Sequence, residues 1–270
     1  MTTAADDPPP IEADAYLKWS RTPAAGLLFL LPWLGLYELA ILTGSDPATL
    51  RHPAESWLRS GLLQVGGDWP WLLPVVVAGS LLVWHAGHRW LRGPAARGER
   101  RGTLLAGMLG ESLLAASLLV LAGQMSHAVA TRGVVMSLAQ PPSGPGAWAA
   151  TCLGAGIYEE VLFRLWAIPA MFVLLKALVV PRRIAACVAI VATSLLFASL
   201  HYTAADWATM QSSGVSSPVA IGWMFRTLAG LVFATLFWLR GFGVAVGTHV
   251  LYDAIIVVVT AVQSGGDAVA

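Results

Sequence analysis

The sequence has 270 residues, a formal charge of +1, 57% apolar residues and only 11% charged residues. A soluble domain carries about 25% charged residues, so this composition excludes an ordinary soluble globule, a disordered chain and a nucleic-acid-binding protein with a basic face. The two cysteines, Cys152 and Cys187, are too few for a disulfide framework or a cysteine metal site. The composition indicates a membrane protein that crosses the bilayer several times.

In chain order, a polar tail over residues 1–23 precedes a series of long apolar segments. A helix needs about 20 apolar residues to cross about 30 Å of hydrocarbon. Segments of that length lie at 24–43, 70–91, 103–123, 184–201, 219–239 and 242–263, before a short tail at 264–270. They are apolar throughout, unlike the alternating strands of a membrane β-barrel. We therefore expect an all-α polytopic helical bundle, integral to a membrane (the inner or plasma membrane if the cell is bacterial).

The apolar region 147–180 leaves the number of transmembrane helices at seven or eight. As one helix this region would measure about 50 Å, too long for one ordinary span and short for two, and we expect a break at Pro169. Its length favours eight spans. Basic residues gather on the cytoplasmic side of a membrane, and seven spans put Arg182 and Arg183 on the same side as the arginine-rich loop that follows the second span.

Ionisable residues at bilayer depth are costly and often functional, and three groups of them lie in the second half of the chain. In the first group, Glu160 and Arg164 are four residues apart and share a helix face, so we expect an ion pair between them. Glu159 points about 100° away, which leaves its carboxylate available for chemistry. The alternative interpretation is that both acids only line a polar seam.

The other two groups bring histidines. His201 ends the segment Phe197-Ala198-Ser199-Leu200-His201, and His249 precedes Asp253 by one helical turn. A carboxylate beside an imidazole fixes its tautomer and stabilises the imidazolium form. Alternatively, His201 is an interfacial residue, and His249 and Asp253 are a buried polar pair that holds two helices together.

Taken together, Glu-Glu-x-x-x-Arg, Phe-x-x-x-His and His-x-x-x-Asp stand in this order on separate apolar segments. The combination resembles the signature of the CAAX-processing and bacteriocin-processing family of intramembrane proteases. The resemblance covers residues 147–263, the expected catalytic core, whereas the preceding apolar segments in 24–146 carry no matching motif. Asp253 departs from the pattern, because the family usually has Asn there.

The resemblance implies an intramembrane endopeptidase that hydrolyses a peptide bond of a membrane-embedded or lipidated peptide or protein in a water-accessible cavity. It implies that Glu159 is the general base on a water molecule, that His201 assists, and that His249 and the residue at 253 stabilise the oxyanion. Glu160 and Arg164 become a supporting pair. An ionised carboxylate at position 253 would repel the oxyanion. We therefore expect Asp253 to stabilise the protonated form of His249, so that the imidazolium donates a hydrogen bond to the oxyanion.

A metalloprotease is the second interpretation of the same residues, because the family is described both as glutamate-type and as metal-dependent. Glu159, His201, His249 and Asp253 are an acceptable set of zinc ligands. No His-Glu-x-x-His occurs in the chain, the motif that places two ligands and a base on one helix. We therefore favour the metal-free mechanism, and zinc is the expected cofactor if a metal is bound.

Two functions outside proteolysis also fit buried carboxylates and histidines: a proton- or ion-coupled transporter and a non-catalytic membrane interaction protein. Transporters usually have repeated halves with paired broken helices. Here the polar motifs crowd into the second half without a matching set in the first, which favours the enzyme.

Overall fold

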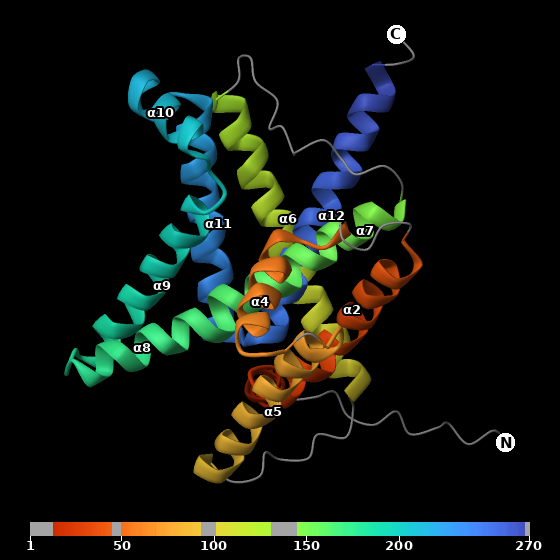
Figure 1. Ribbon diagram of the computed structural model, residues 1–270, viewed down its shortest axis with the longest axis vertical. Coiled ribbons are helices and arrows are strands. Elements are labelled where there is room, and N and C mark those ends of the chain that lie inside the picture. Colours follow the sequence, from red (N-terminus) through yellow and green to blue (C-terminus); the bar gives the residue numbers. More distant parts are fainter. Residues whose placement is uncertain (1–12, 45–49, 68, 93–100, 131–144, 268–270) are drawn as a thin grey trace, which may run out of the picture.

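The computed structural model describes residues 13–44, 50–67, 69–92, 101–130 and 145–267, and over these residues it contains helices and no strand. This confirms the predicted all-α bundle. The α-helices are α1 Ala13–Ser20, α2 Pro23–Thr43, α4 Pro53–Gln64, α5 Leu72–Arg92, α6 Arg101–Ala130, α7 Pro145–Gly154, α8 Ile168–Ala177, α9 Arg182–Ser199, α10 Ala204–Ser213, α11 Pro218–Arg240 and α12 Phe242–Asp267 (Figure 1). Two π-helical segments, η1 Ala155–Glu159 and η2 Val161–Ala167, lie between α7 and α8. Of the two predicted tails, residues 1–12 and 268–270 lie outside the described residues.

Among the described helices, five are long and apolar enough to cross a membrane: α2, α6, α9, α11 and α12. Large apolar side chains on their outer faces are exposed, such as Leu42 on α2 and Leu114 on α6. A soluble protein would carry mostly polar side chains over such faces, whereas hydrocarbon favours apolar ones. The chain is an integral, multi-pass membrane protein.

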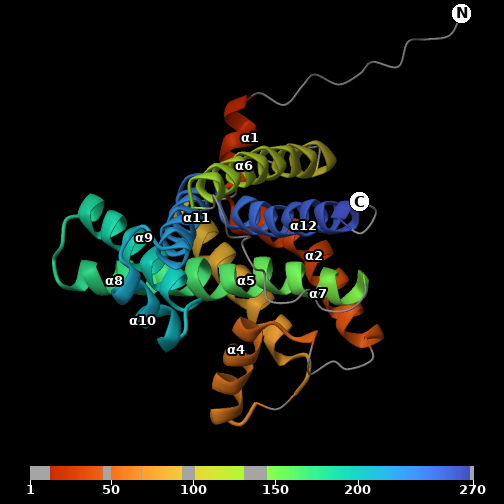
Figure 2. The same cartoon turned by 90° about the horizontal axis from the view of Figure 1, so that it is seen from above.

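The expected break at Pro169 is absent, because α7, η1, η2 and α8 follow one another as a continuous helix (Figure 2). Pro169 is the second residue of α8, directly after η2. A proline is tolerated in the first turn of an α-helix, where its missing N–H matters least, so the change of helix type accommodates it. The chain turns back only after Ala177, where Val179 has a φ of 60°. A single passage of this segment favours seven spans over eight, and the number of spans stays a prediction.

Caps fix where two of the long helices around the site begin. Thr22 and Ser217 each accept a backbone N–H three residues on and are each followed by a proline at the first helical position, which is a strong start signal. Gly241, with a φ of 96°, ends α11 and leads directly into α12. Only glycine adopts this conformation readily, and the sharp turn makes α11 and α12 packed neighbours.

Helix α12 lies at the centre of the bundle and packs against α6, α11, α2 and η1 (Figures 1 and 2). Its crossing with η1 is close because Gly156 has no side chain: a Cβ there would lie 2.7 Å from the backbone nitrogen of Val250. Small residues allow such close approach between membrane helices. This crossing brings the end of η1 against the part of α12 that carries His249.

Candidate active site

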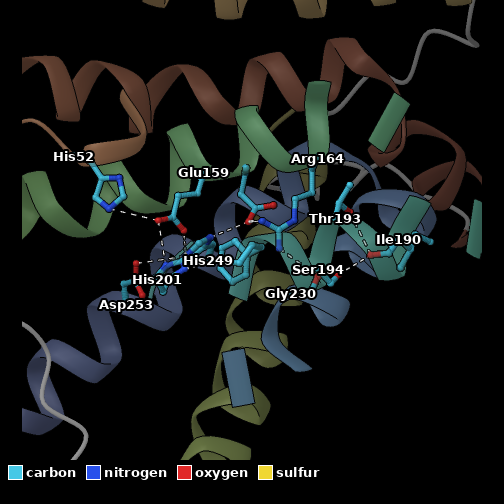
Figure 3. Close-up of polar contacts among 12 residues, drawn as sticks. His52, Glu159, Arg164, Ile190, Thr193, Ser194, His201, Gly230, His249 and Asp253 are labelled. Atoms are coloured by element: carbon cyan, nitrogen blue, oxygen red, sulfur yellow. Dashed lines mark hydrogen bonds and ion pairs between the residues drawn. The ribbon is translucent and has the colours of Figure 1, made fainter. Parts of the chain in front are cut away.

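The four residues predicted to carry the chemistry meet at one place (Figure 3). Glu159 ends η1, His201 follows the last turn of α9, and His249 and Asp253 lie one turn apart on α12. Glu159 Oε1 is 3.5 Å from His201 Nε2, and its Oε2 is 3.7 Å from His249 Nε2. Asp253 Oδ2 is also 3.7 Å from His249 Nε2. Three distant parts of the chain therefore supply one cluster of two carboxylates and two imidazoles.

The side chains of the cluster differ in exposure. The side chains of Glu159 and His249 are only 8% and 6% exposed, whereas those of His201 and Asp253 are 29% and 26% exposed. His201 and Asp253 are therefore the members of the cluster most accessible from outside, and Glu159 and His249 are the more deeply buried ones.

The predicted ion pair between Glu160 and Arg164 is confirmed, with Arg164 Nη1 3.1 Å from Glu160 Oε1 and both side chains buried. Arg164 also donates to the carbonyl of Gly230 on α11 at 3.2 Å. Its guanidinium lies 4.5 Å from the ring centroid of Phe197 on α9, at cation–π distance. The buried pair therefore ties η2 to both α9 and α11.

Glu160 has a second partner, because His249 Nδ1 lies 2.8 Å from Glu160 Oε1. Since an ionised carboxylate only accepts, Nδ1 carries the proton and donates it. The imidazole of His249 thus lies between the two adjacent glutamates, with Nδ1 toward Glu160 and Nε2 toward Glu159. Glu159 and Glu160 lie where the two π-helical segments η1 and η2 meet. π-helical turns are wider than α-helical ones and recur at functional sites.

His201 is oriented in a similar way. Its Nδ1 lies 2.7 Å from the carbonyl oxygen of Phe197, and a carbonyl can only accept, so Nδ1 carries the proton. In the neutral ring, Nε2 then presents a lone pair toward Glu159. The Phe197 ring packs against His201 at 4.8 Å and against His249 at 6.1 Å, which gives the phenylalanine of the second motif a packing role between the two histidines.

A third histidine, which no sequence motif predicted, joins the cluster. His52 Nε2 is 3.6 Å from Glu159 Oε1. His52 caps the N-terminus of α4, where its Nδ1 accepts the N–H of Ala54 at 3.3 Å. Burial lowers the pKa of His52, so the ring is neutral at pH 7. In the sequence, His52-Pro53 followed by Glu55 is typical only of a helix start, so no motif marked His52 as a site residue.

One family model matches the part of the chain that carries the three motifs. A family model described as type II CAAX prenyl endopeptidase Rce1-like matches residues 141–255, a segment that contains all three motifs. Over this segment the chain is similar to the Rce1-like family. The comparison with curated proteins found no match, and neither did the comparison with solved structures. The match supports a CAAX prenyl protease-like peptidase, whereas His52 lies outside the matched segment.

A metal ion is the other use to which the cluster could be put. Among the residues that the structure describes, no group of three or more His, Cys, Asp or Glu side chains could hold a metal ion. His52 and His201 both lie beside Glu159 Oε1, and His249 Nε2 lies beside the carboxylates of Glu159 and Asp253. The predicted zinc site at Glu159, His201, His249 and Asp253 stays a prediction.

Proposed function

We propose that the chain hydrolyses a peptide bond in a membrane-embedded or lipidated peptide or protein, with Glu159 as the general base on a water molecule. The observation that carries the proposal is the position of the Glu159 carboxylate, which is buried and has the Nε2 atoms of His201 and His249 at 3.5 and 3.7 Å. The family match over residues 141–255 supports the reaction class. The assignment of steps to residues rests on the hydrogen-bonding capacity of each group.

Glu159 and His201 together suit the activation of water. Glu159 Oε1 and the lone pair on His201 Nε2 are both acceptors, and they lie 3.5 Å apart. One water molecule that donates a hydrogen to each acceptor has its oxygen lone pairs free for the substrate carbonyl. Glu159 takes one proton as the water oxygen attacks the carbonyl carbon, a step to which a positioned base contributes about 10²- to 10⁴-fold in rate.

His249 suits the stabilisation of the oxyanion that this attack creates. Its Nδ1–H is engaged by Glu160, which Arg164 holds in turn, so the ring is fixed. Its Nε2 lies between the carboxylates of Glu159 and Asp253, and carboxylates on both edges favour the imidazolium form. The Nε2–H of the imidazolium donates to the oxyanion. When the intermediate collapses, Glu159 returns its proton to the leaving amine. The products are an amine and a carboxylic acid, which releases its remaining proton to solvent.

The test separates proteolysis from the transporter interpretation. Purified protein in proteoliposomes is given internally quenched peptides that are farnesylated near the C-terminus or carry a single membrane-spanning segment, and the products are identified by mass spectrometry. A pH-sensitive dye inside the same vesicles reports proton flux. We expect cleavage at one bond by the wild type and none by Glu159→Gln. Proton flux coupled to a solute, with every peptide left intact, would overturn the proposal.

A further inference from the structure

We propose that His52 is a positioning residue that holds the carboxylate of Glu159 in place by donating its Nε2–H to Oε1. This inference rests on the proposed role of Glu159, and it gives the region before the family-matched segment a part in the active site. His52 Nε2 and Glu159 Oε1 are 3.6 Å apart. Catalytic hydrogen bonds are often long without substrate and shorten when the complex forms.

The direction of this hydrogen bond follows from the other nitrogen of the ring. His52 Nδ1 accepts the N–H of Ala54, and in a neutral imidazole the second nitrogen is then the donor. His201, the other imidazole beside Glu159 Oε1, has the opposite arrangement, because its Nδ1 faces the Phe197 carbonyl and its Nε2 presents a lone pair. Of these two rings, His52 is therefore the one that can donate to Oε1.

A buried polar network holds the start of helix α4, and therefore His52, in one position. Glu55, one turn after His52, is fully buried and contacts Tyr37 on α2 as well as Arg51 and Arg59 on either side of it. Buried charges are tolerated where they are paired in this way. The network therefore anchors the first turn of α4 to α2, with His52 at its start.

The helix that carries Glu159 has a glycine at the point where His52 approaches it most closely. A Cβ on Gly154, five residues before Glu159, would lie 2.8 Å from the Cβ of His52 and 3.0 Å from Cε2 of Tyr37. Real Cβ atoms do not approach other atoms so closely, so a glycine at this position is what allows α4 to lie against the helix that carries Glu159. The close approach at Gly154 thus brings the capping side chain of α4 beside the buried carboxylate.

Two substitutions separate the capping role of His52 from the contact with Glu159. Asparagine places an acceptor where Nδ1 lies but has no atom at the position of Nε2, so His52→Asn keeps the cap and loses the contact. Glutamine places an amide N–H near the position of Nε2, so His52→Gln keeps the donor. We expect His52→Asn to lower kcat by about 10- to 100-fold with KM unchanged, and His52→Gln to recover most of that loss. Wild-type kcat in His52→Asn would overturn the proposal.

A double-mutant cycle on unfolding tests the contact whether or not a substrate has been found. The unfolding midpoint in detergent is measured for the wild type, His52→Asn, Glu159→Gln and the double variant. We expect the shift caused by His52→Asn to shrink in the Glu159→Gln background, because the charged acceptor is gone. Additive shifts would overturn the proposal. A chain that shows coupling but cleaves no peptide would contradict the proposed function and leave the contact standing.

Discussion

His249 donates its Nδ1–H to Glu160 across 2.8 Å, and this contact joins the first and third motifs of the chain. It gives the second glutamate of the pair a different task from the first. Glu160 is held by Arg164 and fixes the orientation of an imidazole, whereas Glu159 lies on the Nε2 side of the same ring. The two adjacent glutamates therefore lie beside the two nitrogens of one histidine, Glu160 at Nδ1 and Glu159 at Nε2.

Arg164→Met should destabilise the chain strongly, because Glu160 would be left buried with a charge and no guanidinium. Removal of one partner of a buried ion pair costs about 3–5 kcal/mol, which unfolding in detergent can measure. Arg240→Met is the matched control: Arg240 pairs with Glu111, whose side chain is 33% exposed, and the loss should be smaller. Equal stability of the two variants would contradict the structural role assigned to Arg164.

Asp253→Asn tests whether Asp253 keeps His249 charged. The substitution keeps the shape of the side chain and removes one of the two carboxylates beside Nε2. We expect the alkaline limb of the pH–rate profile to move to lower pH, because a neutral His249 has no proton on Nε2 to donate. The measurement is kcat/KM across the pH range. Full activity with an unchanged profile would show that Asp253 does not have this role.

Gly156→Ala should disrupt the crossing that brings Glu159 to His249. The added Cβ would lie 2.4 Å from Cγ2 of Val250 and 2.7 Å from its backbone nitrogen, and overpacking of this kind costs about 1–3 kcal/mol. We expect a lower unfolding midpoint and loss of peptide cleavage. Gly35→Ala on α2 is the control, since a Cβ there meets no atom within 4 Å, and it should keep wild-type stability and activity.

Exhaustive chelation should leave peptide cleavage unchanged if Glu159 and the histidines act on water directly. Metal analysis of the purified protein accompanies the assay. Loss of activity on chelation, followed by recovery when zinc is added back, would favour the metal-dependent interpretation of the same four residues.

The bundle could be predicted from composition because a segment that crosses hydrocarbon must be long and apolar, and that requirement is visible in the sequence. The Glu160–Arg164 ion pair could also be predicted, because residues four apart lie on the same face of an α-helix. The prediction of a helix break at Pro169 was wrong. A sequence does not reveal the π-helical turns that let the helix continue through this proline.

The convergence of His52 on Glu159 could not be read from the sequence. The two residues come from parts of the chain far apart, and their meeting depends on how α4 docks against α2 and η1. Nothing in the local pattern distinguishes His52 from an ordinary helix cap. Contacts of this kind arise from tertiary packing, for which a single sequence has no periodic signal.

The most direct test of the account is kcat/KM for Glu159→Gln on a membrane-anchored peptide, measured beside Glu38→Gln. Glu38 accepts a hydrogen bond at 3.2 Å from the hydroxyl of Tyr158, the residue before Glu159, so the control removes a neighbouring carboxylate that has no part in the proposed chemistry. We predict a loss of about 10²- to 10⁴-fold for Glu159→Gln, with unaltered folding, and near-wild-type activity for Glu38→Gln. Cleavage by a folded Glu159→Gln at the wild-type rate would contradict the account.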